Sequence, residues 1–346
     1  MKYEIFENYS KGKEPSKYEN KYIWETAIGL QQVDNLEPSE YLIEIANSHI
    51  NGKISLDYAS DLLNTYYEEK REINDRTEEA DKVSLRIVEL LSNKFFTFSI
   101  MQYISIHKYL FSGIYSHAGK IRDYNISKKE WVLNGDTVIY GNAFDLFETM
   151  EYDLNQEKKY SYKNKNIEEI IKHIASFTAG LWQIHLFGEG NTRTTAVFLI
   201  KYLNKLGFDV TNEIFSKNAW YFRNALVRAN YNNYKLGINE TTYYLELFLK
   251  NLLLNENNKL SNKELHIEYV QNKEEILSEC ETKLLEIFKN NPTIKLEEVS
   301  SIMNKSLRTI KTKVKILTNK GFLERIDGKK YGSWKVNSPQ PSGAKK

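Results

Sequence analysis

Apolar residues recur three and four positions apart along most of the chain, which is the pattern of helices that bury one face. This pattern predicts helices over residues 22–33, 40–50, 55–73, 76–91, 99–115, 167–184 and 192–208. The apolar face of the 167–184 helix is formed by Ile170, Ile171, Ile174, Phe177, Leu181 and Trp182. We expect this helix at the centre of the core, and the fold class is predicted to be mainly α.

One stretch departs from the helical pattern. Residues 126–141, ISKKEWVLNGDTVIYG, carry β-branched and aromatic side chains on both sides of Asn134-Gly135, a pair typical of tight hairpin turns. A single hairpin cannot form the core of a sheet, so we expect a flap that lies over another part of the molecule. The flap residues expected to dock a target are Trp131, Val132, Leu133, Val138, Ile139 and Tyr140.

The C-terminal part of the chain predicts a separate small fold. Helices are expected over residues 281–292, 295–306 and 307–322, followed by two strands about Asp327-Gly328. The buried stripe of the third helix consists of Leu307, Ile310, Val314 and Leu317. This order of three helices and a hairpin resembles the winged helix-turn-helix family.

Changes in composition and periodicity divide the chain into six segments. We expect a disordered N-terminus (1–20), a helical regulatory module (21–75), a helical core (76–255), a polar linker (256–278), a winged helix (279–336) and a disordered tail (337–346).

Composition places the protein among soluble globular proteins. The chain has 346 residues, of which 41% are hydrophobic, which is enough for two or three domains. It contains no run of about 18 uncharged apolar residues, and its N-terminus is too polar for a secretory leader. We therefore expect a cytoplasmic protein with no membrane partner. The single cysteine, Cys280, excludes an intrachain disulfide and a zinc site built from cysteines.

The net charge of +2 conceals an asymmetry. Residues 295–346 contain 13 Lys and Arg but 4 Asp and Glu, so this segment is strongly basic and the rest of the chain is acidic. A basic surface of this kind suits the phosphates of DNA, and protein docking or homodimerisation is the alternative. The residues expected to contact DNA are Arg308, Lys311 and Lys315 on the third helix and Lys329 and Lys330 in the wing.

The segment HLFGEGNTRTTA, residues 185–196, lies between two predicted core helices and combines residue types that neither a buried helix nor an ordinary turn requires. Because the next helix begins near Thr192, the backbone N–H groups of residues 190–193 lack helical partners and form an anion site. The Arg193 guanidinium suits phosphate, and the Glu189 carboxylate suits Mg²⁺. The candidate nucleotide-binding residues are Gly188, Glu189, Gly190, Asn191, Thr192 and Arg193.

His185 stands four residues before Glu189 and is a candidate general base. Together these residues predict a site for a nucleotide polyphosphate, with a base directed at an incoming hydroxyl. If this base has the ordinary histidine pKa of about 6.5, the reaction rate should fall as the pH drops below that value. The alternative is that this segment only caps a helix and that its histidine has no function. Six residue types suited to this chemistry fall within nine positions, which is rare by chance, so the alternative is disfavoured.

The pattern H-x-F-x-[DE]-G-N-x-R, here His185 to Arg193, resembles the active-site motif of the Fic (filamentation induced by cAMP) family. The flap and the upstream AGKIR, with Gly119 and Arg122, lie where that family has them, and the resemblance covers about residues 76–255. It implies an all-helical core that transfers AMP from ATP to a Ser, Thr or Tyr hydroxyl of a target protein or of the enzyme itself.

This resemblance also implies roles for individual residues. His185 is the general base, Glu189 holds Mg²⁺, and Asn191 and Arg193 hold phosphates. Phe187 packs beneath the loop, and the flap aligns the backbone of the target by β-augmentation.

The chain departs from the family pattern at two positions. Thr192 replaces a glycine, and Ala196 replaces a second arginine that meets the γ-phosphate end of ATP. Doc toxins also lack both residues and resemble kinases that bind ATP in the inverted direction. Phosphotransfer or transfer from another nucleotide is therefore an alternative, as is a non-catalytic, nucleotide-sensing, DNA-binding regulator.

Residues 22–67 resemble VbhA-type antitoxin modules, in which a helix carries a glutamate that pairs with the second arginine. The alignment places Asp34 at that glutamate and Asn35 after it. Because Ala196 cannot accept a carboxylate, we expect this helix to block the site sterically, or Asp34 to reach Arg193 instead; a plain docking domain is the alternative. If the module restrains the site, removing residues 1–72 raises self-modification.

Five other side chains, in two groups, are singled out by their type. Tyr221 and Asn224 belong to an aromatic-rich helical segment and are candidates to line an adenine pocket. The histidines expected to be structural are His107, His117 and His173.

Overall fold

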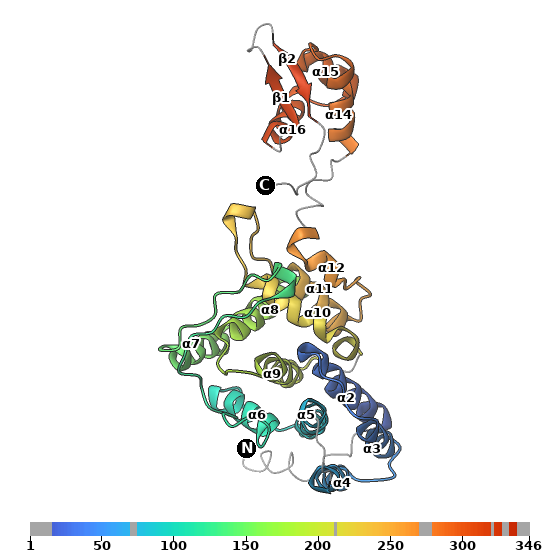
Figure 1. Ribbon diagram of the computed structural model, residues 1–346, viewed down its shortest axis with the longest axis vertical. Coiled ribbons are helices and arrows are strands. Elements are labelled where there is room, and N and C mark those ends of the chain that lie inside the picture. Colours follow the sequence, from blue (N-terminus) through green and yellow to red (C-terminus); the bar gives the residue numbers. More distant parts are fainter. Residues whose placement is uncertain are drawn as a thin grey trace. The chain divides into compact units, whose positions relative to one another are not determined.

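The computed structural model describes residues 16–69, 75–210, 213–269, 279–319, 322–326 and 332–337 (Figure 1). The chain forms two compact units, which divide between Ile267 and Glu268. The prediction of a mainly α fold is confirmed, because helices make up most of the described residues. None of the described helices combines the length and the apolar character that crossing a bilayer requires.

The first unit opens with four short helical elements. They are α2 (Lys17–Gly29), the 3-10 helix η1 (Leu30–Asp34), α3 (Glu40–Ile50) and α4 (Leu56–Glu69). The expected disorder of residues 1–20 is wrong for the last of them, because Ser16 and Glu19 form a capping box that starts α2; residues 1–15 lie outside the described residues.

Further helical elements follow in the first unit. They are α5 (Asp75–Ser92), α6 (Ile100–Phe111), α7 (Leu146–Lys159), α8 (Ile167–Ile184), α9 (Asn191–Lys205), α10 (Ile214–Ala229), η3 (Tyr234–Leu236), α11 (Tyr243–Leu254) and α12 (Asn262–Leu265). Helix α8 packs against α7, α9, α10 and α11, as the continuous apolar face predicts. Leu265 and Ile267, in the expected linker, are also buried in this core.

The N-terminal helices share their core with the rest of the first unit. Helix α2 packs against α5 and α10, and the buried side chains of α2 to α4 belong to the same continuous cluster as those of α5 to α11. A Cβ on Gly29 would lie 2.4 Å from the Ser216 Cα, so α2 approaches the start of α10 as closely as two backbones can. The elements that lie before α5 are therefore built into the core.

The predicted flap hairpin is wrong as secondary structure. Asn134 and Gly135 do adopt the left-handed turn that their sequence predicts, with φ of 54° and 86°. However, the 3-10 helix η2 (Trp131–Leu133) precedes the turn, and residues 126–141, all of them described, contain no strand. Val132 and Leu133 are adjacent and both buried, which a strand does not permit because its side chains alternate between two faces.

The second unit has its own core. Helices α14 (Glu279–Asn290), α15 (Leu296–Met303) and α16 (Leu307–Asn319) are followed by the antiparallel strands β1 (Leu323–Ile326) and β2 (Ser333–Val336). The buried cluster of this unit includes Leu284, Phe288, Val299, Ile310, Leu317 and Leu323. The elements follow the predicted order, and the winged helix assignment stays a prediction. Lys329, Lys330 and residues 338–346 lie outside the described residues.

Candidate active site

The loop that the sequence singled out joins α8 to α9 and turns at two left-handed residues. His185 ends α8 with φ of 52°, and Gly190 precedes α9 with φ of 76°. A Cβ on Gly190 would lie 2.4 Å from the Phe111 ring, and one on Gly188 would lie 2.7 Å from the Tyr124 hydroxyl. The two glycines therefore allow aromatic side chains to close over the loop at the N-terminus of α9.

Asn191 fixes the loop from within. Its Oδ1 accepts a hydrogen bond from the Phe187 N–H at 3.0 Å, and its Nδ2 donates to the Phe187 carbonyl at 2.7 Å. The Phe187 ring stacks on the His107 ring beneath the loop, with centroids 3.6 Å apart. Both polar ends of the Asn191 side chain are used in this way, so Asn191 clamps the loop, whereas the sequence resemblance assigned it to phosphate.

His107 holds the loop from the opposite side. Its Nδ1 accepts a hydrogen bond from the Gly119 N–H at 2.9 Å, so the proton of the neutral ring lies on Nε2, which donates to the Glu189 carbonyl at 3.0 Å. Burial lowers the pKa of His107 to about 4. This histidine is structural, as expected, but its contact with the loop could not be predicted from the sequence.

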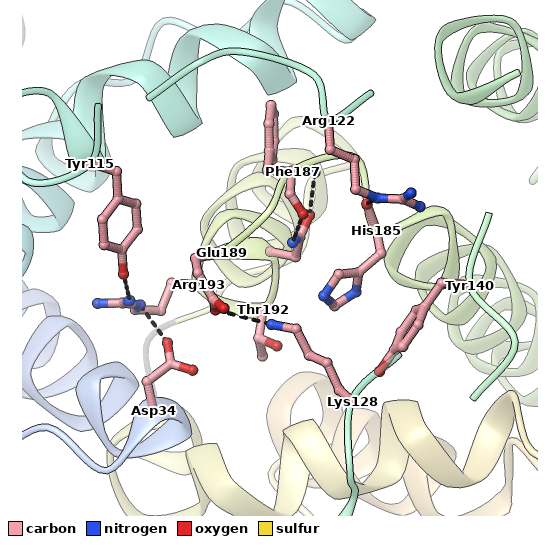
Figure 2. A network of polar contacts seen from close by, with 12 residues as sticks. Asp34, Tyr115, Arg122, Lys128, Tyr140, His185, Phe187, Glu189, Thr192 and Arg193 are labelled. Atoms are coloured by element: carbon pink, nitrogen blue, oxygen red, sulfur yellow. Dashed lines mark hydrogen bonds and ion pairs between the residues drawn. The ribbon is translucent and has the colours of Figure 1, made fainter. Parts of the chain in front are cut away.

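His185 is buried beside the flap (Figure 2). Its ring centroid lies 4.3 Å from that of Tyr140 and 5.3 Å from that of Trp182, and neither ring nitrogen has a hydrogen-bond partner among the described residues. Burial, followed by the positive charge of Lys128, lowers the pKa of His185 well below its ordinary value of 6.5. The imidazole is therefore neutral at pH 7, which is the state that a general base requires.

Arg122 joins the end of α8 to both ends of the flap. Its Nε donates to the His185 carbonyl at 2.7 Å, its Nη1 to the Tyr124 carbonyl at 2.6 Å and its Nη2 to the Gly141 carbonyl at 2.5 Å. Arg122 therefore positions the backbone of His185, a role that the forked geometry of a guanidinium suits.

Glu189 is the only exposed residue of the segment 185–193, with 55% of its side chain exposed. Its Oε2 lies 3.0 Å from the Lys128 Nζ, which reaches over the loop from the start of the flap (Figure 2). Sequence analysis missed Lys128, because a lysine within SKKE has the pattern of an ordinary solvated charge.

The donor set of the loop fits Mg²⁺ as a site with a single protein carboxylate. Among the described residues no group of three or more His, Cys, Asp or Glu side chains could hold a metal ion by itself. Mg²⁺ bound with a nucleotide commonly takes one or two carboxylates and completes its shell with phosphate oxygens and water. The Lys128 ammonium beside Glu189 indicates that this carboxylate is placed to hold a cation.

Arg193 is enclosed by the N-terminal elements, with 1% of its side chain exposed. Its Nε forms an ion pair with Asp34 Oδ2 at 2.9 Å, and its Nη2 donates to Glu79 Oε1 at 2.6 Å. Its Nη1 donates to Gln31 Oε1 at 3.0 Å. Burial acts to lower the pKa of Arg193, but the charges of Asp34 and Glu79 outweigh it and raise that pKa. Of the arrangements expected for Asp34, the structure has the one in which it reaches Arg193.

The neighbours of these groups have simpler roles. Asn35 ends η1 in the left-handed conformation, with φ of 53°. Thr192 accepts a hydrogen bond from the Trp182 Nε1 at 3.0 Å and so ties α9 to α8. Ala196, the second departure from the family pattern, is fully buried.

Most of the predicted flap residues are not available to a partner. Val132, Leu133, Val138 and Tyr140 are buried, whereas Trp131 is 49% exposed and Ile139 is 84% exposed. The exposed pair is therefore the part of the flap that could meet a target. Sequence alone could not separate Trp131 from Val132 and Leu133, because that division follows from η2, whereas Val138, Ile139 and Tyr140 alternate between buried and exposed as in an extended segment.

Tyr221 and Asn224 lie inside the packing of α10 against α11 and α12. The Tyr221 hydroxyl donates to the Tyr244 carbonyl at 3.2 Å, and Asn224 Nδ2 donates to Asn262 Oδ1 at 2.8 Å. Both side chains are buried, so the structure does not bring them to the loop as an adenine pocket would require.

The basic residues predicted on the third helix of the second unit do share a surface. Arg308, Lys311 and Lys315 line a shallow concavity on α16, with Thr312 between them. The opposite side of α16 contributes Ile310, Val314 and Leu317 to the core.

A solved structure and a family model are similar to this chain or to part of it. A Fic family protein from Desulfovibrio desulfuricans G20, solved by crystallography at 2.70 Å resolution, is 12% identical, with a TM-score of 0.40 over 91% of this chain and 87% of that chain. No curated protein matches. The model of the Fic/DOC family, whose members generally transfer AMP or another nucleotide group to proteins with ATP and Mg²⁺, matches residues 97–203. The chain thus carries a Fic/DOC family domain over residues 97–203.

Proposed function

We propose that the protein is a Fic-type adenylyltransferase that transfers AMP from ATP to a Ser, Thr or Tyr hydroxyl of a protein. The observation that carries this proposal is the neutral imidazole of His185, which lies on the same short loop as the exposed carboxylate of Glu189 and the N-terminus of α9. The first N–H groups of a helix have no helical acceptor and attract phosphate, which favours binding of the triphosphate at this end of α9.

In the reaction, His185 takes the proton from the target hydroxyl. The hydroxyl oxygen forms a bond to the α-phosphorus of ATP, and the bond from that phosphorus to the β-phosphate oxygen breaks, so that pyrophosphate leaves. Glu189 would hold Mg²⁺ together with the phosphates, and the ion supplies neutralisation of their charge. Catalysis then rests on position and electrostatics. Trp131 and Ile139 are the exposed flap residues that would meet the target.

The arrangement of Arg193 supports a resting state. Its guanidinium is occupied by Asp34 and Glu79, and His185 is covered by Tyr140. Binding of phosphate by Arg193 therefore requires that η1 release it, which gives Asp34 a regulatory role and makes Asn35 the residue at which η1 ends.

Labelling with two forms of radioactive ATP tests the proposal. The full-length protein is incubated with cell lysate, Mg²⁺ and either α-³²P-ATP or γ-³²P-ATP, beside a His185→Ala variant. We expect protein label from the α-position only, including label on the enzyme itself, and its loss in the variant. Label from the γ-position alone would indicate phosphotransfer, and absence of both would indicate a non-catalytic regulator.

A second function is favoured by one observation in the second unit. Arg308, Lys311 and Lys315 share the exposed side of α16, which suits contact with the phosphates of DNA. DNA binding that weakens steeply with salt, and weakens further in a Lys311→Ala variant, is the expected result. Retention of the protein as a dimer without DNA binding would favour the docking alternative.

A further inference from the structure

A second cavity lies in the first unit, away from the loop. Its volume is about 740 Å³, which is within the range of small-molecule sites. It opens between α2, the end of α5 and the end of α9, and its lining shares no residue with the loop at 185–193. The candidate active site therefore does not account for this cavity.

Three hydrogen-bond donors of the cavity wall lack an acceptor among the described residues. The Ser92 hydroxyl is buried and has no hydrogen-bond partner. The buried Tyr22 hydroxyl has only the Thr26 hydroxyl beside it, and neither of these two has another partner, so the pair leaves one donor without an acceptor. Lys201 is also buried, and its Nζ donates to the carbonyls of Leu90 and Asn93, each at 2.6 Å. An ammonium has three N–H groups, so one donor of Lys201 remains. Buried donors without acceptors are costly, which suggests that a ligand supplies the acceptor.

The charge of the cavity indicates the kind of acceptor. Lys94 and Lys205 are exposed and line the cavity together with the buried Lys201. The Lys205 Nζ lies 6.0 Å from the centroid of the Phe96 ring. Two carboxylates, Glu19 and Asp209, also line the cavity, and Glu19 accepts a hydrogen bond from the Ser16 N–H at 2.6 Å. Three lysines against two carboxylates leave the lining with a net positive charge. An anionic group is therefore favoured.

Part of the remaining wall is apolar, beside the polar residues Ser16, Asn93 and Asn204. It is formed by the Tyr22 ring, Ile23, Phe96, Ile200, Phe208 and Val210. A ligand that fits this wall and the three donors has a carboxylate at one end and a hydrocarbon body at the other. We propose that this cavity binds a small amphipathic carboxylate, held by Lys201, Tyr22 and Ser92.

Octanoate is a direct probe of this site, because octanol and octylamine have the same chain without the negative charge. Isothermal titration of the full-length protein is expected to show one octanoate per chain, octanol at least about tenfold weaker, and no binding of octylamine. Tyr22→Phe and Ser92→Ala are each expected to weaken octanoate by about tenfold, the effect of about 1.4 kcal/mol. Ser92→Ala should not lower the melting temperature, since the Ser92 hydroxyl has no partner to lose, and Tyr22→Phe loses no more than the contact with the Thr26 hydroxyl.

Two further variants complete the test. Tyr18→Phe removes a hydroxyl from an exposed tyrosine of the same helix and should leave octanoate binding unchanged. Asn204→Trp places a large side chain into the cavity from its exposed rim and should abolish binding. The proposal is overturned if octanoate does not bind, if octanol binds equally well, or if Tyr22→Phe and Ser92→Ala bind octanoate like the unmodified protein.

Discussion

At the scale of single residues, burial decides the charge of the groups around the loop. His107 and His185 are buried without carboxylate neighbours, so their pKa values fall and both rings stay neutral. Arg193 is equally buried, but Asp34 and Glu79 keep it charged. The same environment therefore supplies a neutral base and a fixed cation within one short loop.

His107 makes the stability of the protein depend on pH. Its pKa is about 4 in the folded protein and about 6.5 when unfolded, so the unfolded state binds more protons below pH 6.5 and stability falls as pH falls from 6.5 to about 4. Between pH 7 and pH 5, the loss attributable to His107 is about 2 kcal/mol. Urea unfolding at the two pH values should show this extra loss in the unmodified protein relative to His107→Gln; equal losses would contradict the assignment.

The proposed AMP transfer would depend on pH through His185. The ordinary histidine pKa predicted an acid limb near pH 6.5, but burial lowers the pKa of this residue, so the base stays deprotonated to lower pH. The rate of labelling from α-³²P-ATP is therefore expected to stay constant as pH falls from 8 through 6.5. A rate that halves near pH 6.5, with the protein still folded by circular dichroism, would show that the ring titrates normally.

At the scale of elements, the short helix η1 and helix α5 together enclose the Arg193 side chain. Helix η1 brings Gln31 and Asp34 to a side chain that lies more than 150 positions later in the chain, and α5 adds Glu79. Because both carboxylates act on one guanidinium, removing either should release it only in part.

Asp34→Asn and Glu79→Gln test this division. Each substitution keeps the shape of the side chain and removes one of the two charges on Arg193, so we expect the affinity for ATP to rise by about tenfold, or about 1.4 kcal/mol. Titration with a fluorescent ATP analogue measures the change. Asp57→Asn, an exposed carboxylate of α4, is the matched control and should have no effect. Unchanged affinity in both test variants would mean that Arg193 is not a phosphate ligand.

The sequence was informative where structure depends on near neighbours. The loop at 185–193 could be predicted because its glycines, its turn and the start of α9 are local features. Lys128 and Glu79 could not, since they come to the loop from 61 residues away from Glu189 and 114 residues away from Arg193. The flap shows both cases, because the turn at Asn134 was predicted but burial by the surrounding helices replaced the strand before it with η2.

At the scale of the whole molecule, the two units have separate hydrophobic cores, whereas the N-terminal helices have none of their own. The buried residues that they add to the first core include Trp24, Ala27, Leu30, Leu42 and Leu63. The proposed regulation by η1 would therefore have to act through local release, because detaching the whole N-terminal part would expose the core.

Two truncations distinguish these cases. Removing residues 1–72 was expected from the sequence to raise self-modification, but the shared core predicts a protein that aggregates or unfolds without a cooperative transition. Removing residues 268–346 takes away a unit with its own core and should leave the melting temperature of the first unit within a few degrees. Calorimetry measures both; a cooperative, active protein lacking residues 1–72 would contradict the shared core.

The partners of Arg122 have a consequence for turnover. Every hydrogen bond that Arg122 makes within the described residues goes to a carbonyl oxygen, so no neighbouring carboxylate cancels its charge. A positive potential therefore persists beside His185 even while the carboxylates of Asp34 and Glu79 offset the charge of Arg193. Small anions concentrate in such a potential. The pyrophosphate product would be retained there longest at low ionic strength, because salt screens the attraction. Added salt should therefore speed the release of pyrophosphate and raise the turnover rate, until the salt also weakens the binding of ATP.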